Sequence, residues 1–178
     1  MRTLADSNKL FLYSSKGETN MTIIPSKLPA GVLRANEGEQ YIQMGNSIIF
    51  KSLSDETGGG AFMWENETPH GAMVPPHIHQ TEDEFIYLVE GEMEVTIGNA
   101  THMVRPGDLV KMPRGIPHAV HSTGQAMTKS FWTVIPAGKM EAFFRALGTL
   151  PTDQPPSPET FARLFAEHDI VLLPPPGA

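Results

Sequence analysis

Short β-rich runs separated by tight turns occupy the middle of the chain, and they constrain its fold more than any other feature. The runs cover residues 47–53, 60–65, 84–89, 92–97, 109–112 and 129–135. Several of the intervening turns contain a glycine, which readily adopts the positive φ that tight turns demand: Gly91, Gly98, Gly107 and Gly115. Consecutive runs are therefore expected to be antiparallel neighbours in a sandwich or barrel.

Alternation within residues 92–97 shows which side of such a strand is apolar. Met93, Val95 and Ile97 share one face, and their polar neighbours share the other. The chain also holds 16 glycines and 16 prolines, a high content that fits many short turns. We expect an all-β protein in which each sheet has one core face and one solvated face.

The period becomes helical after Pro136. Apolar residues then recur three and four positions apart, which predicts a helix that ends near Gly148. A proline-rich link over residues 151–158 leads to a second predicted helix with Ser157 as its N-cap. Residues 172–176 are expected to be extended.

The organisation that follows is one compact domain, as 178 residues with 40% hydrophobic content allow. Residues 1–44 form an N-terminal arm and leading strands, in which Met1 and Met21 are alternative starts. Residues 45–136 are expected to form the barrel, and residues 137–178 are expected to form a C-terminal helical extension.

Charge and hydropathy exclude several classes of partner. The formal net charge of −7 and the pI near 5.4 argue against nucleic acid, because neutralising phosphates needs clustered Lys and Arg. No apolar run approaches the roughly 20 residues that a membrane-spanning helix needs. The opening residues lack the apolar core of a secretory signal, so we expect a cytoplasmic protein.

The candidate site is built without cysteine, since the chain has none and any metal must use His, Asp or Glu. His77 and His79 leave the same face of an extended strand, a geometry that can chelate one ion. Glu84 has the parity of Ile86 and Leu88, so it is predicted to face inward. A buried carboxylate there requires a cation or hydrogen bonds to compensate for its charge.

His118 is the third histidine candidate, because it shares the parity of apolar Ile116 and Val120. Taken alone, it fits a buried neutral histidine as well as a ligand. Glu82 and Asp83 are expected to be solvated turn acids. The remaining histidines are expected to be structural or exposed: His70, His102, His121 and His168.

These residues and their spacing resemble the two motifs of the cupin superfamily. The first motif is matched by Gly71, His77, His79, Glu84 and Gly91. The second is matched by Gly107, Pro113, Gly115 and His118. Ser122 stands where the second motif usually closes with Asn, a position that is normally structural. Over most of its length the chain resembles small single-domain cupins similar to bacterial quercetin 2,3-dioxygenase, including the C-terminal segment from Phe143 to Gly148.

The resemblance implies a double-stranded β-helix, the jelly-roll barrel of cupins, with one or two C-terminal helices. It implies one divalent transition metal ion (Fe, Ni, Mn, Co, Cu or Zn) held by His77, His79, Glu84 and His118. It also implies a dioxygenase that cleaves a flavonol-like aromatic or enolic molecule with dioxygen, with Glu84 as both ligand and catalytic base. A homodimer is implied as well.

A flat substrate needs an apolar slot. Its candidate lining residues are Phe62, Trp64, Met73, Ile86, Met112 and Trp132. Two alternatives remain open, because the fold does not determine the reaction. A metal-dependent isomerase or lyase would need cationic anchors, for which Lys51, Arg105, Lys111 and Arg114 are the candidates. A non-catalytic metal- or ligand-binding protein would need neither anchors nor oxygen chemistry.

Overall fold

The computed structural model describes residues 27–43, 45–151 and 156–174. Its first five strands are β1 (Gln40–Gln43), β2 (Asn46–Ser52), β3 (Phe62–Thr68), β4 (Met73–His79) and β5 (Asp83–Glu90). The later strands are β6 (Met93–Ile97), β7 (Ala100–Val104), β8 (Leu109–Met112), β9 (His118–Ser122), β10 (Thr128–Ile135) and β11 (Ile170–Leu172). The helices are α1 (Met140–Leu147) and α2 (Pro158–Glu167).

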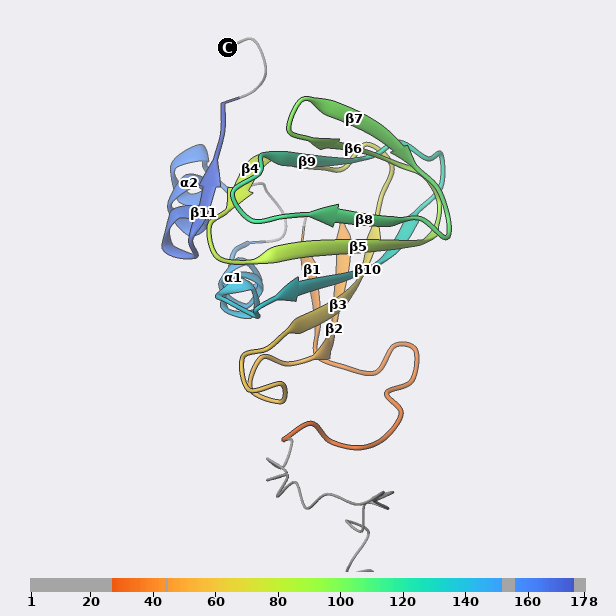
Figure 1. Cartoon of the computed structure of the whole chain (residues 1–178), viewed down its shortest axis with the longest axis vertical. Helices are drawn as coiled ribbons and strands as arrows, with labels where there is room; N and C mark the ends of the chain where they lie inside the picture. Colours follow the sequence, from red (N-terminus) through yellow and green to blue (C-terminus); the bar gives the residue numbers. More distant parts are fainter. Residues whose placement is uncertain (1–26, 44, 152–155, 175–178) are drawn as a thin grey trace, which may run out of the picture.

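Two antiparallel sheets face each other (Figure 1). One has the order β1-β2-β3-β10-β5-β8, and the other has the order β11-β4-β9-β6-β7. From β3 onward every connection between consecutive strands changes sheet, except the hairpin between β6 and β7. The expected all-β jelly-roll with C-terminal helices is thereby confirmed.

The core lies between the sheets and is built by the expected alternation of side chains. On β5, Ile86 and Leu88 are fully buried, whereas Tyr87 between them is 46% exposed. Trp64 on β3 stacks on Trp132 of the neighbouring β10, with ring centroids 5.8 Å apart. Burying one large apolar side chain contributes roughly 1.5–3 kcal/mol, so this interior is a major source of stability.

Gly91 shows why a glycine is needed at the β5–β6 turn. Its φ is 90°, a value that L side chains rarely adopt. A Cβ there would also lie 2.9 Å from Cα of Thr128, so a larger residue would push β10 away. Positive φ at the other glycines confirms the predicted turns: Gly98, Gly107 and Gly115.

β3 differs from the strand predicted over residues 60–65, because it begins at Phe62 and continues to Thr68. Its polar end is held on both sides: Glu67 is opposite Ser47 of β2 and Lys129 of β10. Pairing with two neighbours thus extends a segment whose own residues are weak strand formers.

The two helices lie at one end of the barrel, with α2 next to β11 and α1 below it (Figure 1). Gly148 is the C-cap of α1, as expected. The Ser157 side chain caps α2 by accepting a hydrogen bond from the Thr160 backbone N–H at 3.1 Å. In the part of the chain that the structure describes, no helix is long and apolar enough to cross a membrane.

The sheets take in strands on both sides of residues 45–136: β1 precedes them and β11 follows them. Residues 27–39 are irregular. The alternative start at Met21 and most of the predicted N-terminal arm lie outside the described residues, as do parts of the proline-rich link and of the extended tail.

Candidate metal centre

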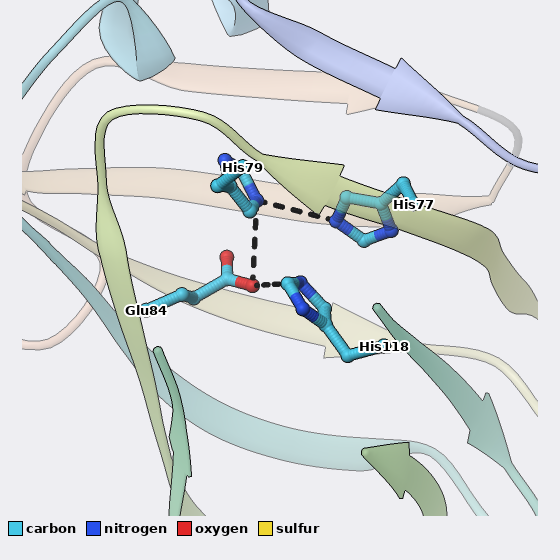
Figure 2. Close-up of side chains that lie close together, drawn as sticks. All are labelled: His77, His79, Glu84 and His118. Carbon is cyan, nitrogen blue, oxygen red and sulfur yellow. Dashed lines mark hydrogen bonds and ion pairs between the residues drawn. The ribbon is translucent and has the colours of Figure 1, made fainter. Parts of the chain in front are cut away.

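Four buried side chains converge inside the barrel: His77, His79, Glu84 and His118 (Figure 2). Each offers one ligand atom, and these atoms all lie within 4.8 Å of one another. Each residue is at most 4% exposed. The structure therefore brings together all four residues that the motifs predicted.

Strand geometry explains the convergence. His77 and His79 are two residues apart at the end of β4, so both point to the same face. β9 pairs with β4 so that His118 lies opposite His77. Glu84 comes from β5 in the other sheet, and the short turn after β4 carries the chain across to it. The cluster thus joins the two sheets.

The ring nitrogens that face the cluster are the Nε2 atoms. Nε2 of His77 lies 3.2 Å from Nε2 of His79. The Nδ1 atoms of His77 and His118 instead donate to the backbone carbonyls of Pro75 (2.8 Å) and Ile116 (3.0 Å). Because a carbonyl oxygen can only accept, Nδ1 carries the proton, and the Nε2 lone pair is directed into the cluster.

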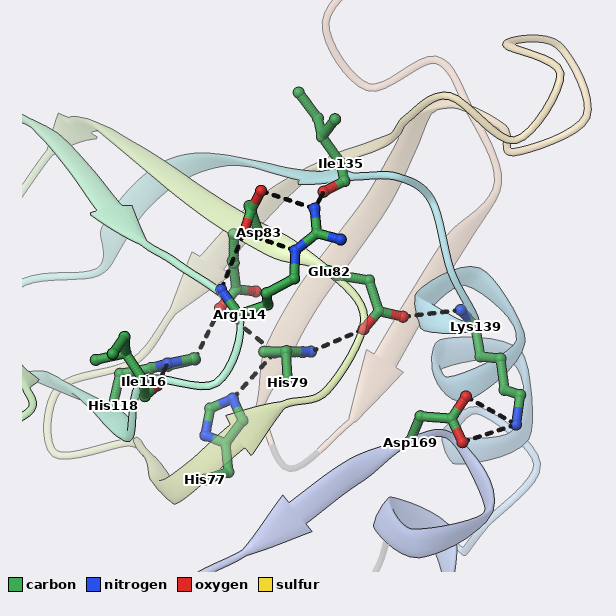
Figure 3. Close-up of polar contacts among 11 residues, drawn as sticks. His77, His79, Glu82, Asp83, Arg114, Ile116, His118, Ile135, Lys139 and Asp169 are labelled. Atoms are coloured by element: carbon green, nitrogen blue, oxygen red, sulfur yellow. Dashed lines mark hydrogen bonds and ion pairs between the residues drawn. The ribbon is translucent and has the colours of Figure 1, made fainter.

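Glu82 is a residue whose role the sequence reasoning misjudged. It was expected to be a solvated turn acid, but it is 1% exposed. Its Oε2 lies 3.7 Å from Nδ1 of His79, and its Oε1 accepts a hydrogen bond from the Lys139 backbone N–H at 3.0 Å (Figure 3). Gly138 permits this approach, since a Cβ there would overlap the Glu82 carboxylate.

At 3.7 Å the Glu82 carboxylate faces Nδ1 of His79 at ion-pair distance and without a hydrogen bond, which is the side on which second carboxylates orient metal-bound histidines. The expectation failed because the residue's environment comes from the segment before α1, which is distant in sequence. Its spacing from His79, three residues further along the chain, was the one available signal. The neighbouring Asp83 instead lies nearer the surface, paired with Arg114 at 2.8 Å.

Electrostatics favour a neutral His77 ring and an ionised Glu84 carboxylate. Burial lowers the pKa of His79, but the nearby Glu84 and Glu82 outweigh it and leave that pKa above its ordinary value. Burial, together with the nearby His118, lowers the pKa of His77 to about 4, so its ring is neutral at neutral pH. Burial alone would raise the pKa of Glu84, but attraction to His79 and contact with His118 hold that pKa below its ordinary value. Both states are the ones that bind a metal ion.

The residues present fit a metal ion. Oε2 of Glu84 and Nε2 of His118 are 3.3 Å apart and fully buried, yet neither has a hydrogen-bond partner among the described residues. Two acceptors that face each other without a proton are costly to bury, and a cation between them removes that cost. Three nitrogen donors and one carboxylate oxygen suit a divalent transition metal.

A cavity of about 130 Å³ opens beside this cluster. Of the candidate pocket residues, Trp64, Met73 and Trp132 line it. The others are buried in the core and are not part of its lining: Phe62, Ile86 and Met112.

Aromatic side chains from both helices close the cavity on one side. Phe143 and Phe144 come from α1, and Phe161 and Phe165 come from α2. The Phe165 ring meets the His77 ring edge-on at 6.1 Å between centroids. Sequence reasoning assigned these residues only to helix packing, because a helical stripe does not reveal which surface it covers.

Known proteins with similar sequences share this part of the fold. The family model described as "Cupin domain" matches residues 64–134, which contain all four clustered residues. An uncharacterised protein of Methanocaldococcus jannaschii is 30% identical over 91 residues, which are 50% of this chain and 73% of that protein. The chain belongs to the cupin superfamily.

Quercetin 2,3-dioxygenase of Bacillus subtilis is 26% identical to this cupin over 128 residues, or 72% of the chain. The alignment spans only 37% of that enzyme's length.

Solved structures agree on the fold. KdgF from a Halomonas species superposes with a TM-score of 0.55 at 17% identity, covering 62% of this chain and 99% of its own. An RmlC-like cupin from Shewanella frigidimarina also gives 0.55 at 17% identity, covering 65% and 98%.

Proposed function

We propose that this cupin is a metal-dependent dioxygenase that acts on an aromatic or enolic small molecule. The observation that carries the proposal is the lining of the cavity beside the metal cluster. Both tryptophans of the chain line it, together with phenylalanines from α1 and α2, and none of the described lining residues is Lys or Arg. Such walls favour a flat apolar ring and hold no cationic side chain that would pair with an anionic substrate.

The cationic anchors that an isomerase or lyase for small acids would need lie elsewhere. Arg114 binds the Asp83 carboxylate near the surface. The Lys51 ammonium donates to the backbone carbonyls of Arg34 and Glu37. Apart from the metal ion itself, a carboxylate substrate would meet no cationic side chain among the described residues that line this cavity, which favours the dioxygenase over this alternative.

The similarity to a quercetin 2,3-dioxygenase supports the same reaction class. A divalent metal at this site would supply the Lewis acidity that makes a substrate hydroxyl acidic and the redox chemistry that dioxygen requires.

Glu84 is the group placed to take the hydroxyl proton. It lines the cavity and belongs to the metal cluster, so it contacts both regions. Its lowered pKa keeps it ionised and able to accept a proton at neutral pH. The histidines stay oriented through their Nδ1 hydrogen bonds, and deep burial keeps bulk water from the reacting atoms.

The test is elemental analysis of protein purified without added metal, combined with oxygen uptake on quercetin and on simpler enols and phenols. We expect about one transition metal ion per chain, among Fe, Ni, Mn, Co, Cu and Zn, and substrate-dependent uptake of dioxygen. Bound metal without uptake on any of these compounds would contradict the dioxygenase. Protein that takes up no metal would contradict the site itself.

A further inference from the structure

The cavity has a second polar region that the metal cluster does not use. Gln43 is 2% exposed and lines the cavity, yet neither Nε2 nor Oε1 of its side chain has a hydrogen-bond partner among the described residues. Asn66 and Trp64 also line the cavity, and Oδ1 of Asn66 and Nε1 of Trp64 are likewise buried without a hydrogen-bond partner among the described residues. Buried polar groups are normally paired, so these groups indicate a ligand that pairs them.

Strand register places this region away from the metal. Val134 of β10 lies opposite Glu84 on one side and Phe62 on the other, so these two residues are level with each other. Asn66 is four residues further along β3, which is about 13 Å along the strand at roughly 3.3 Å per residue.

Gln43 lies near Asn66 because it ends β1 at the β1–β2 turn, where it is opposite Asn46. Two residues later on β2, Ile48 is opposite Asn66. We call Gln43, Asn66 and Nε1 of Trp64 the polar end of the cavity, which faces the metal cluster across the tryptophan walls.

The chemistry of the polar end is neutral. The Gln43 amide donates and accepts, Trp64 Nε1 only donates, and Asn66 Oδ1 only accepts. No Lys, Arg or Asp is among the described lining residues, and the one carboxylate there is Glu84 of the metal cluster. Such groups recognise a hydroxyl, carbonyl or amide and do not compensate a charge.

The size of the cavity sets a limit as well. Its volume of about 130 Å³ is below the roughly 300 Å³ at which pockets for drug-sized ligands begin, so a single ring fits better than a fused polycyclic compound.

We propose that the substrate is an uncharged single-ring phenol or enol with a second polar substituent, which the polar end binds while the hydroxyl faces the metal cluster. This inference rests on the proposed function, because it concerns the same cavity. It adds Gln43 and Asn66 as residues that determine which substituent is accepted.

The first experiment measures binding under nitrogen, so that no turnover takes place. Phenol, 4-hydroxybenzamide and 4-hydroxybenzoate are titrated into the purified protein, and quenching of Trp64 and Trp132 reports their entry. We expect 4-hydroxybenzamide to bind at least tenfold more tightly than phenol, because its amide pairs the polar end. We expect the benzoate to bind at least tenfold more weakly than the benzamide.

Substitutions at the polar end then test whether its residues cause the preference for the benzamide. In Gln43→Met and Asn66→Leu, the benzamide-to-phenol ratio is expected to fall to within threefold. Gln40→Met is the matched control, since Gln40 is exposed on the same strand and its substitution should leave the ratio unchanged. Circular dichroism and thermal melting check that each variant folds; if one does not, Gln43→Glu replaces Gln43→Met and should reject the benzoate further.

Three results would overturn the inference: equal binding of phenol and benzamide to the unaltered protein, an unchanged ratio in both variants, or no binding of any of the three compounds. Failure of the dioxygenase proposal looks different, because the benzamide preference would persist while oxygen uptake stayed absent.

Discussion

The metal cluster and the polar end of the cavity are both buried and polar, but their side chains are held in different ways. At the metal cluster, His77 and His118 each have Nδ1 tied to a backbone carbonyl, so that only Nε2 faces the centre. At the polar end, Gln43 has both amide atoms unpaired among the described residues. The first arrangement suits a point charge, whereas the second suits a neutral group with its own hydrogen-bond donors and acceptors.

The largest effect should come from removing a ligand at the metal cluster. His118→Ala should abolish stoichiometric metal binding, because the remaining donors no longer enclose the ion. His121→Ala is the matched control: this residue is on the same strand but outside the cluster. Elemental analysis checks both variants. Full metal occupancy in His118→Ala would show that the cluster is not the metal site, and the contrast between the metal cluster and the polar end would fail.

Glu84→Gln tests the role of Glu84 as a metal ligand separately from its role as the catalytic base. The amide can still offer an oxygen to the ion but cannot take a proton at neutral pH. We therefore expect most of the metal to remain while turnover falls by about 100-fold or more, the range typical for loss of a general base. Oxygen-uptake rates normalised to bound metal provide the measurement. Unchanged turnover would remove the base role from Glu84.

Glu82→Gln tests whether the carboxylate behind His79 acts through that histidine. Loss of its charge should weaken metal affinity by about 10- to 100-fold, the usual cost of removing such a partner. Competition with a metal-sensitive dye measures the affinity. Asp83→Asn is the control, because that carboxylate pairs with Arg114 and not with the cluster. Equal effects of both substitutions would contradict the orienting role.

A smaller effect concerns pH in the metal-free protein. The pKa of His77 is about 4 in the folded state and 6.5 when unperturbed, so the unfolded chain takes up the proton first as pH falls. The contribution of His77 to the free energy of unfolding is therefore fully present above pH 6.5 and is lost as the pH falls towards 4. Between pH 7 and pH 5 the loss should be about 2 kcal/mol. Urea unfolding of the metal-free protein, compared with His77→Gln, isolates this contribution; equal pH dependence in the two would contradict it.

Much of the fold and of the metal cluster could be predicted because the signals are local. Alternating side chains determine the two faces of strands such as β5 and β6 wherever those strands are placed. Glycine at position 91 meets a turn requirement that is visible in one short segment. His77 and His79 share one face of a strand, and Glu84 shares the inward parity of the next strand, so the spacing of these three donors matches the cupin motif.

The sequence by itself determined the strand pattern, the turns and the donor set of the cupin motifs. Tertiary structure alone decided that Glu82 turns inward beneath Lys139, that β11 pairs with β4, and that Gln43 and Asn66 share a cavity. The physical reason is that burial and pairing depend on which distant segments meet. The alternation of neighbouring residues determines on which face of a strand a side chain lies. Which residues form the opposite wall of the cavity depends on segments far along the chain.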